Sequence, residues 1–406
     1  MGIVVQKFGG TSVADVEKIR NVANRVVKTV AQGNSVVVVL SAMAGVTDSL
    51  IKLAHQASKN PDGRELDSLL STGEQTTVTL MAMMLNDMGY KACSLLGFQA
   101  EIFTNSAATK ARIISIGADK ILKLLRDGHI VVVAGFQGID AGGNITTLGR
   151  GGSDTSAVAV AAAINADVCE IYTDVDGVYT TDPSICDKAR KLGKISYDEM
   201  MEMASLGAKV LQIRSVEFAK KYNVPVHVRS SFSDEEGTMV LSENTGMEEL
   251  VISGVTCSKG EARITFKKVP DTPGVASRIF KPIADARILV DMIIQNTRAG
   301  GQTDLTFTVS KNDYEKALAI SRETGKEIGA QEVNGADNLA KVSIIGVGMK
   351  NHSGVASTMF SALAAEGINI LMISTSEIRI SCIVEEKYAE LAVRVLHSAF
   401  GLDKDK

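Results

Sequence analysis

Apolar residues in roughly the first 230 positions follow two alternating patterns. The short runs VVVVL from residue 36, IVVVAGF from residue 130 and VPVHV from residue 224 have the length and composition of buried strands. Between such runs, apolar residues recur at helical spacing, as they do after the first strand at Val13, Val16, Ile19, Val22 and Val26. Strands that alternate with helices form parallel sheets covered by helices, so this pattern predicts one α/β domain over residues 1–233.

The alternation is interrupted after residue 233. Residues 234–249 contain six acidic residues and no basic residue, together with Gly237 and Gly246. Dense charge of one sign with glycine is typical of a solvated connection. We therefore predict an acidic linker at 234–249.

The remainder of the chain contains an internal repeat. Gly274-Val275-Ala276-Ser277 recurs 80 residues later, and the same shift pairs several apolar positions that follow. Each copy predicts the order strand, helix, strand, strand, helix, which forms a small α+β sandwich. We place the copies at residues 263–335 and 341–406, and expect a further strand at 250–258 to join the sheet of the second copy.

Two glycine-rich turns precede predicted helices in the first domain. They are KFGG at residues 7–10 and LGRGGSD at 148–154, where Ser153 and Asp154 are candidate helix caps. One such turn often only lets chain segments approach closely. Backbone N–H groups at a helix start attract anions, however, and the planar guanidinium of Arg150 matches a carboxylate or phosphate. Two such turns predict two anionic substrates.

Three further segments combine glycine with hydroxyl and acidic side chains. They are SAMAGVTDSL from residue 41, STGEQTTVTLMAMML from residue 71 and IYTDVDGVYTTDP from residue 171. Each has an ordinary structural interpretation when taken alone. The first is a strand-to-helix turn, the second a helix start at Ser71 with Glu74 as a capping carboxylate, and the third an Asp-Gly hairpin.

Composition and charge exclude several classes of protein. The 406 residues are 45% hydrophobic and 22% charged, which suits two or three globular domains. A net charge of −4 does not suggest a basic surface that binds nucleic acid. No apolar run is long enough to span a bilayer. Met1 leads directly into a predicted strand, so we expect no signal peptide. The five cysteines and five histidines are scattered, which predicts reduced thiols in the cytoplasm and no histidine-based mechanism. GxxxxGK[ST] is absent and GxGxxG is incomplete, which disfavours an oxidoreductase.

The ordered set of motifs carries a resemblance that no single motif carries. KFGGTS, SAM with Thr47, STGE, GRGGSD, TDVDGVYTTDP and GAKVLQ, followed by two modules that resemble ACT domains, are similar to the aspartate kinases of the amino-acid kinase superfamily. The resemblance covers essentially the whole chain. It implies a mainly parallel α/β sheet sandwiched by helices, followed by two α+β ferredoxin-like ACT domains. It also implies ATP-dependent phosphorylation of the β-carboxylate of L-aspartate to 4-phospho-L-aspartate, the first step towards lysine, threonine and methionine.

The resemblance further implies roles for individual residues. Lys7 and Asp154 would be catalytic, with Arg150 holding the α-carboxylate of aspartate and Glu74 its ammonium group. Nucleotide would contact Lys7, Gly9, Gly10, Thr173, Asp174, Tyr179, Lys209 and Val210. Aspartate would contact Ser41, Thr47, Glu74, Arg150, Gly151, Gly152, Ser153 and Asp154. Magnesium would arrive with ATP, so we expect no separate protein metal site. Ser184 stands where the family usually has a basic nucleotide contact, and Lys188 or Arg190 are candidates to replace it.

For the ACT modules, the resemblance implies feedback by lysine, threonine or both. The effector would contact Asp271, Gly274, Ala276, Asp291, Gln295, Asn369 and Ile370. Asp271 and Asp291 suit this role chemically, because an ammonium group removed from water needs an anionic partner. The modules also predict a homodimer, or a tetramer with a shorter regulatory subunit that starts at Met247. No nucleic-acid or membrane partner is expected.

Two other functions remain open at this point. One is a kinase of the same superfamily that acts on another amino acid or small carboxylate. The other is an amino-acid sensor that has lost catalysis. The presence of Lys7, Glu74, Arg150 and Asp154 together favours an active kinase, and the pairing of STGE with GRGGSD favours aspartate.

Overall fold

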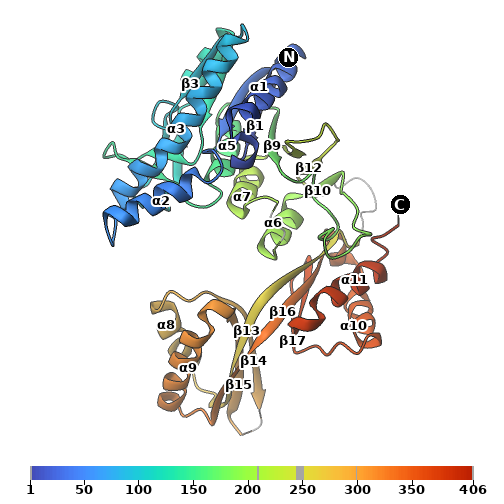
Figure 1. The fold of residues 1–406 in the computed structure, drawn as a ribbon. Coiled ribbons are helices and arrows are strands. Elements are labelled where there is room, and N and C mark those ends of the chain that lie inside the picture. The colour runs from blue at the N-terminus through green and yellow to red at the C-terminus, as the bar shows by residue number, and fades with distance from the viewer. Residues whose placement is uncertain (1, 208–209, 244–250, 299, 405–406) are drawn as a thin grey trace. The chain divides into compact units, whose positions relative to one another are not determined.

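The computed structural model describes residues 2–207, 210–243, 251–298 and 300–404. The chain forms two compact units, which Figure 1 shows in one view. The first unit consists of Met1–Tyr179 and Lys191–Met247, and the second of Thr180–Arg190 and Glu248–Lys406. The predicted division near residue 233 is therefore incomplete, because a short piece of the N-terminal half belongs to the second unit.

An eight-stranded sheet forms the centre of the first unit. Its order is β10 (Lys194–Ser196), β12 (Thr238–Leu241), β11 (Val226–Ser230), β9 (Val168–Thr173), β1 (Ile3–Phe8), β2 (Ser35–Leu40), β6 (Ile130–Ala134) and β3 (Ala92–Leu95). All neighbours are parallel except β11 and β12. The mainly parallel sheet predicted from the valine-rich runs is confirmed. Helices cover both faces of the sheet, so side chains that point to either face of these strands are buried and apolar.

Helices form a layer on each side of this sheet. The helices of the unit are α1 (Val16–Ala31), α2 (Val46–Ala57), α3 (Gly63–Asp87), α4 (Asp119–Arg126), α5 (Gly152–Ala163), α6 (Tyr197–Ser205) and α7 (Ile213–Tyr222), with a 3-10 turn at Gly10–Val13. On one face, α1 and α3 enclose a core in which Phe8 and Tyr172 stack at 4.5 Å. On the other, α5 packs against β1, β2 and β9 and is itself flanked by α7.

A second sheet and three short strands of the main sheet, β3, β10 and β12, were not predicted. The small sheet has the order β5 (Ile113–Ile116), β4 (Ile102–Thr104), β7 (Gln137–Ile139) and β8 (Ile145–Thr147). Strands of three or four residues are too short to show a clear apolar alternation. Strand β12 lies inside the stretch predicted as a linker, where Val240 is buried against its neighbours. The predicted linker at 234–249 is thus wrong for residues 238–241, and residues 244–249, including Met247, lie outside the described residues.

The segment Thr180–Arg190 folds into the second unit. Thr180 Oγ1 lies 2.8 Å from Nε2 of the buried His397, and Arg190 Nε donates to the carbonyl oxygen of Leu402 at 2.7 Å. Ile185 packs against the apolar core of the second repeat copy. Ser184 and Arg190, considered above for nucleotide contact, therefore lie in a segment that is anchored to the second unit.

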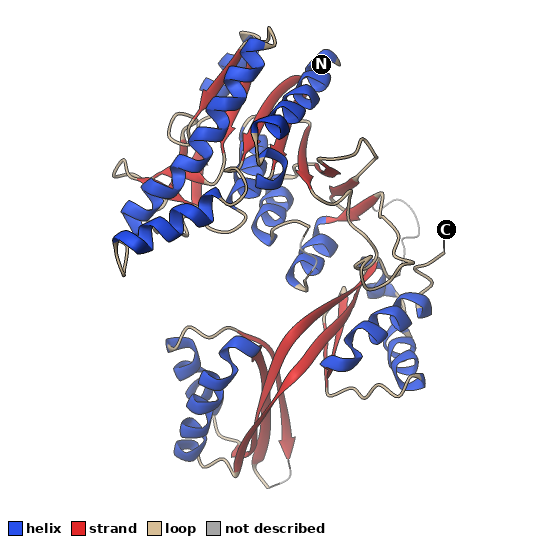
Figure 2. Cartoon of the chain, in the orientation of Figure 1, coloured by secondary structure: helices blue, strands red, loops and turns tan. Residues whose placement is uncertain are grey.

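The second unit is a single six-stranded sheet with two pairs of helices, one pair for each repeat copy (Figure 2). The strand order is β14 (Val290–Arg298), β15 (Gln302–Ser310), β13 (Gly254–Pro270), β16 (Glu332–Ile345), β18 (Arg379–Glu385) and β17 (Met372–Thr375). Helices α8 (Val275–Asp285) and α9 (Tyr314–Ile328) cover the first copy, and α10 (Val355–Ala365) and α11 (Ala389–Ala399) cover the second. Short 3-10 turns lie at Lys311–Asp313, Val347–Asn351 and Glu386–Tyr388.

The repeated glycines start equivalent helices. Gly274 and Gly354 precede α8 and α10 with φ of 92° and 94°, left-handed values that glycine adopts without strain. The long strand β13 serves both copies, since residues 254–259 pair with 340–345 of β16 and the rest pair with β15 and the start of β16. The run placed at 250–258 thus supplies the first part of β13.

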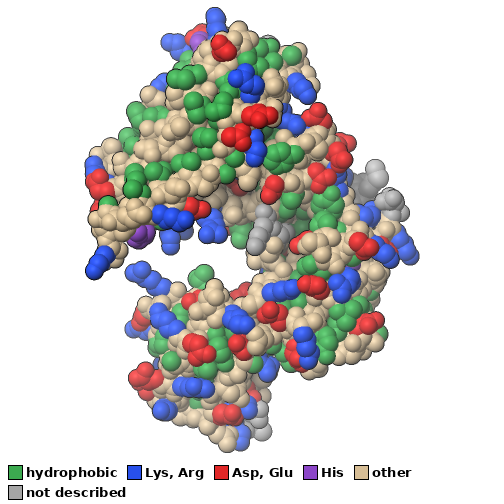
Figure 3. All heavy atoms as spheres, viewed as in Figure 1, with side chains coloured by type: hydrophobic (Ala, Val, Ile, Leu, Met, Phe, Trp, Pro, Cys, Tyr) green, Lys and Arg blue, Asp and Glu red, His purple; other side chains and the backbone are tan. Residues whose placement is uncertain are grey.

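On the face drawn in Figure 3, basic and acidic side chains are interspersed, and neither sign forms a continuous patch. All five cysteines are free thiols. Among the described residues, no helix is both long enough and apolar enough to cross a membrane.

Candidate active site

The candidate site lies where four parallel strands of the first unit end together. Phe8 at the end of β1 pairs with Leu40 of β2 and with Tyr172 of β9, and Leu40 pairs in turn with Ala134 of β6. The loops that follow these strands therefore leave the same edge of the sheet. In open α/β sheets, ligands bind at this carboxyl edge.

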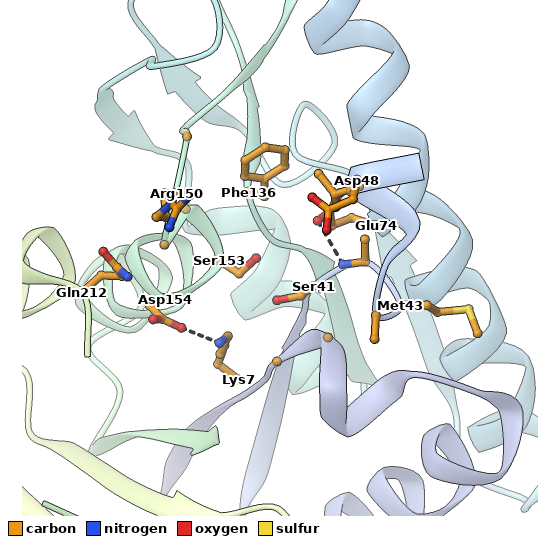
Figure 4. Close-up of a pocket in the computed structure, with 18 of the residues that line it drawn as sticks. Lys7, Ser41, Met43, Asp48, Glu74, Phe136, Arg150, Ser153, Asp154 and Gln212 are labelled. Carbon is orange, nitrogen blue, oxygen red and sulfur yellow. Dashed lines mark hydrogen bonds and ion pairs between the residues drawn. The ribbon is translucent and has the colours of Figure 1, made fainter. Parts of the chain in front are cut away.

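A pocket of about 400 Å³ opens at this edge (Figure 4). It brings together residues that the sequence analysis singled out on four separate segments: Lys7, Gly9, Gly10, Ser41, Thr47, Glu74, Arg150, Gly151, Gly152, Ser153 and Asp154. All the residues predicted to contact aspartate line this one pocket. The segments are far apart in the sequence, so only the fold unites them.

Lys7 and Asp154 form an ion pair in the pocket wall. Lys7 is the penultimate residue of β1, and Asp154 lies in the first turn of α5. Lys7 Nζ is 2.5 Å from Asp154 Oδ1, and each residue is only 9% exposed. Because the ammonium group is buried and held by a carboxylate, its position is fixed before any ligand arrives. An anion that enters the pocket then meets a pre-positioned positive charge.

The turn before α5 places further groups for an anion. Gly151 caps the helix with φ of 70°, and no side chain caps it, so the prediction that Ser153 and Asp154 are caps is wrong. Both residues lie instead within the first turn, where Asp154 is free to pair with Lys7. Arg150 is exposed, and its guanidinium has no ion-pair or hydrogen-bond partner in the described part of the chain. The helix N-terminus and this guanidinium together favour a carboxylate or phosphate.

Glu74 presents an unpartnered carboxylate oxygen. The helix predicted to start at Ser71 starts at Gly63, because the Asp62 side chain accepts hydrogen bonds from Arg64 N and Glu65 N. Glu74 therefore lies inside α3 and is not a cap. Its Oε1 accepts a hydrogen bond from Ala42 N at 2.9 Å, whereas Oε2 is buried with no hydrogen-bond partner among the described residues. Burial raises the pKa of Glu74 to about 7.

This arrangement suits a cationic ligand group. A buried carboxylate oxygen without a partner is costly, and a bound ammonium group would satisfy both its charge and its hydrogen-bonding capacity. In Figure 4, Glu74 and Arg150 project into the pocket from different elements. The pocket thus contains one group for an ammonium, one for a carboxylate and, at Lys7, one for a phosphoryl group.

The first glycine turn lies close to the loop after β2. A Cβ atom added to Gly10 would lie 2.9 Å from the carbonyl oxygen of Ala42, so a larger residue would displace the loop that holds Glu74. Gly10 also begins the 3-10 turn that leads to α1. Glycine at this position allows the two loops of the pocket to approach each other.

The residues predicted for nucleotide contact lie partly outside this pocket. Lys7, Gly9 and Gly10 line it, whereas Thr173, Asp174, Tyr179 and Val210 do not. Thr173 ends β9 and donates its hydroxyl to Asp174 at 3.0 Å, and Tyr179 donates to Asp176 at 2.9 Å. Val210 lies in the turn before α7, and Lys209 lies outside the described residues.

The pocket also contains residues that sequence reasoning missed. They are Ala42, Met43, Ala44, Gly45, Asp48, Phe136, Gly149 and Gln212. Phe136 has φ of 67°, a left-handed conformation that is uncommon for a bulky residue and recurs at functional sites. Gln212 belongs to the quoted GAKVLQ motif, but the residue type alone gave no role.

The predicted effector residues lie in the second unit. Asp271, Gly274 and Ala276 surround the start of α8, Asp291 and Gln295 lie on β14, and Asn369 and Ile370 precede β17. An apolar cluster that contains Met292, Leu371 and Met372 joins β14 to the segment before β17. Asp291 forms an ion pair with the buried Lys341, which also lies 3.7 Å from Glu261. Burial raises the pKa of Glu261.

Comparisons with known proteins agree with this architecture. The amino acid kinase family matches residues 2–230, and an ACT domain family matches residues 267–323 and 342–400. The chain is 57% identical over 404 residues to the aspartate kinase of Pseudomonas putida, covering 99% of this chain and 98% of that one. Two structures of E. coli aspartokinase III are also similar, one in complex with aspartate and ADP and one with lysine and aspartate. The first has a TM-score of 0.77 at 28% identity, and the second 0.78 at 27%; each match covers 98% of this chain and 99% of the other.

A parallel sheet with an anion-binding edge, followed by two ACT modules, defines an amino-acid kinase that carries regulatory domains. Within the amino acid kinase family, the chain belongs to the aspartate kinases. It is therefore an enzyme that phosphorylates aspartate and uses a nucleotide.

Proposed function

We propose that the enzyme transfers the γ-phosphoryl group of ATP to the β-carboxylate of L-aspartate, forming 4-phospho-L-aspartate and ADP. The observation that supports this most strongly is the unpartnered Oε2 of Glu74 in the same pocket as Arg150 and the Lys7–Asp154 pair. Glu74 holds the ammonium group of aspartate and Arg150 holds the α-carboxylate. The β-carboxylate is then directed towards Lys7, while Ser41, Thr47 and Ser153 complete the binding site.

The chemistry requires alignment and charge neutralisation. A β-carboxylate with a pKa near ~3.9 is ionised at neutral pH, so the nucleophile needs no general base. One carboxylate oxygen attacks the γ-phosphorus, the bond to the bridging oxygen breaks, and the electron pair leaves with ADP. Lys7 offsets the repulsion between the carboxylate and the polyphosphate, and Asp154 keeps the Lys7 ammonium in position.

Magnesium fits this scheme as a companion of the nucleotide. In the described part of the chain, no three His, Cys, Asp or Glu side chains are close enough together to hold a metal ion. A nucleotide-bound Mg²⁺ takes most of its ligands from phosphates and water. Bound there, it would neutralise phosphate charge.

We further propose that the second unit binds lysine, threonine or both, and that this binding reduces kinase activity. Such feedback would limit the first step towards these amino acids when they are abundant. E. coli aspartokinase III has been solved with lysine, and the residues around the start of α8 and β14 supply carboxylates for an ammonium group. ACT modules also suit a homodimer, or an assembly with a shorter regulatory chain.

The choice of acceptor tests the proposed reaction. ADP formation by the whole protein should be measured with L-aspartate, L-glutamate and N-acetylglutamate at equal concentrations. We expect ADP only with L-aspartate, because N-acetylation removes the ammonium that Glu74 binds and glutamate places its distal carboxylate one methylene too far. Faster turnover with either other acid would assign the enzyme a different substrate.

A further inference from the structure

Gln212 is a pocket residue without an evident structural task. It lies immediately before α7 at the helix-cap position, but its side chain makes no capping hydrogen bond. Its amide makes no hydrogen bond to any other residue that the structure describes, and the side chain is exposed to the pocket. Figure 4 shows the amide beside Arg150 and Asp154, on the side of the pocket away from Glu74. A free amide at this place is available to a ligand.

The surrounding chain holds Gln212 in position. Arg214, two residues later, donates from one terminal nitrogen to the Leu148 carbonyl oxygen at 2.6 Å and from the other to that of Ala111 at 3.1 Å. These bonds tie the start of α7 to the loop that precedes α5. Burial lowers the pKa of Arg214, but a guanidinium remains charged at physiological pH. The backbone at Gln212 is therefore fixed relative to the glycine turn.

The glycine turn also leaves space for this side chain. A Cβ atom added to Gly151 would lie 2.0 Å from Cγ and 2.6 Å from Cβ of Gln212. No real side chain fits there, so the methylene groups of Gln212 cover the Cα of Gly151. Gly151 thus has two reasons to be glycine: its φ of 70° and its contact with Gln212. The result is an amide held over the N-terminus of α5.

The electrostatics of this position favour an anion. The first N–H groups of α5 and the guanidinium of Arg150 supply partial and full positive charge near the amide, while the charges of Lys7 and Asp154 are paired with each other. A neutral amide adds a hydrogen-bond donor without adding charge. Of the two anionic substrates, the nucleotide suits better, because Glu74 lies on the opposite side of the pocket and Gln212 is only two residues after Val210 of the predicted nucleotide turn.

We propose that Gln212 donates a hydrogen bond from Nε2 to a terminal phosphoryl oxygen of ATP and holds that group in line for transfer. This inference rests on the proposed kinase reaction. It makes Gln212 a catalytic residue that touches the reacting nucleotide, and Arg214 and Gly151 the residues that position it.

Two shape-matched substitutions separate this role from simple packing. Gln212→Met keeps the methylene groups over Gly151 but removes the donor, and Gln212→Glu keeps the shape but places a negative charge beside the phosphates. Hydrogen bonds to charged groups contribute ~1.5–3 kcal/mol, so Gln212→Met should lower kcat/KM for ATP by about 10- to 100-fold. Gln212→Glu should lower it further. The KM for aspartate and the Tm should change little in both variants.

The exposed Gln56 on α2 provides matched controls. Gln56→Met and Gln56→Glu should leave all kinetic constants unchanged. Calorimetry with a non-hydrolysable ATP analogue gives a second readout that does not depend on turnover, and we expect weaker binding to both Gln212 variants. Wild-type affinity and activity in Gln212→Met, or activity of Gln212→Glu equal to wild type, would overturn the inference. Failure of the wild-type protein itself to form ADP with aspartate would refute the proposed reaction instead.

Discussion

Two buried charged groups, Glu74 in the first unit and Lys341 in the second, differ in whether the protein supplies their partners. In the first unit, Glu74 retains a buried oxygen without a partner among the described residues, and that oxygen faces a pocket. In the second, the buried ammonium of Lys341 is already shared between Asp291 and Glu261. A buried polar atom that lacks a partner and faces a pocket is a candidate position for a ligand group to complete the structure. A satisfied cluster stabilises the fold without a ligand, and a ligand must compete with its existing partners. This difference supports our proposals that the first unit binds the substrates and that the second unit binds an effector.

The largest effect is expected at Lys7. Its charge matters most when the carboxylate approaches the polyphosphate, so Lys7→Ala should lower kcat by at least ~100-fold, the scale for removal of one electrostatic donor. The KM for aspartate should change modestly. Steady-state kinetics on a variant with native circular dichroism would measure this, and a near-normal kcat would remove Lys7 from the reaction.

Glu74 should control the affinity for aspartate and its pH dependence. Its pKa is about 7, so the carboxyl group gains a proton and loses its charge as the pH falls below 7. The KM for aspartate should therefore rise by up to about tenfold for each pH unit below 7. Glu74→Gln should raise the KM by about 10- to 100-fold, the range for a lost charged hydrogen bond, and should abolish this pH dependence. A pH profile with the same slope in wild type and variant would contradict the role.

Glu74→Gln should weaken aspartate binding but increase the stability of the folded protein at high pH. Burial raises the pKa of Glu74 in the folded state from its ordinary value of 4.5 to about 7. The stability that the protonated side chain contributes is therefore fully present below pH 4.5 and is lost as the pH rises through about 7. At pH 8 the buried carboxylate is ionised and costly, whereas a glutamine is neutral. We expect Glu74→Gln to have a higher Tm than wild type at pH 8 and a smaller difference at pH 5. An unchanged or lower Tm at pH 8 would indicate that another group satisfies the charge.

Arg150 should show a smaller and more selective effect. Arg150→Lys keeps the positive charge but loses the planar fork that binds a carboxylate through two hydrogen bonds. The KM for aspartate should rise roughly tenfold or more, the scale for loss of one charged hydrogen bond, with little change in the KM for ATP or in Tm. Equal damage to both substrates and to stability would show that Arg150 serves the structure of the glycine turn.

The smallest effect on catalysis is expected in the second unit. Asp291→Asn keeps a hydrogen-bond acceptor for Lys341 but removes the charge that would bind an effector ammonium. Inhibition by lysine or threonine should weaken by about 5-fold or more, within the usual range of allosteric coupling, while the uninhibited kcat stays unchanged. The exposed Asp285 on α8 provides the control Asp285→Asn. Calorimetry that detects neither amino acid on the whole wild-type protein would leave the repeat without an effector role.

Sequence patterns predicted the parallel sheet and the repeat, because both depend on apolar periodicity or on a motif that recurs at a fixed shift. The residues that converge on the pocket were named mainly through the resemblance to aspartate kinases. Sequence patterns failed where contacts outside the motif determine the position of a residue or the start of a helix. The start of α3 depends on Asp62, which lies nine residues before the motif at Ser71. The placement of Thr180 depends on a hydrogen bond to His397, 217 residues away. Gln212 and Phe136 enter the pocket through packing around Gly151 and Gly152, which no pattern of residue types reveals.

Trapping the product tests most directly whether the pocket of the first unit transfers a phosphoryl group to the β-carboxylate of aspartate. An acyl phosphate reacts with hydroxylamine to give a hydroxamate, so the protein should be incubated with ATP, L-aspartate and hydroxylamine, and the product identified by mass spectrometry and nuclear magnetic resonance. We predict aspartate β-hydroxamate in an amount equal to the ADP formed, and neither product with Lys7→Ala above a few per cent of the wild-type rate. ADP without hydroxamate, or a hydroxamate on the α-carboxylate, would contradict the account.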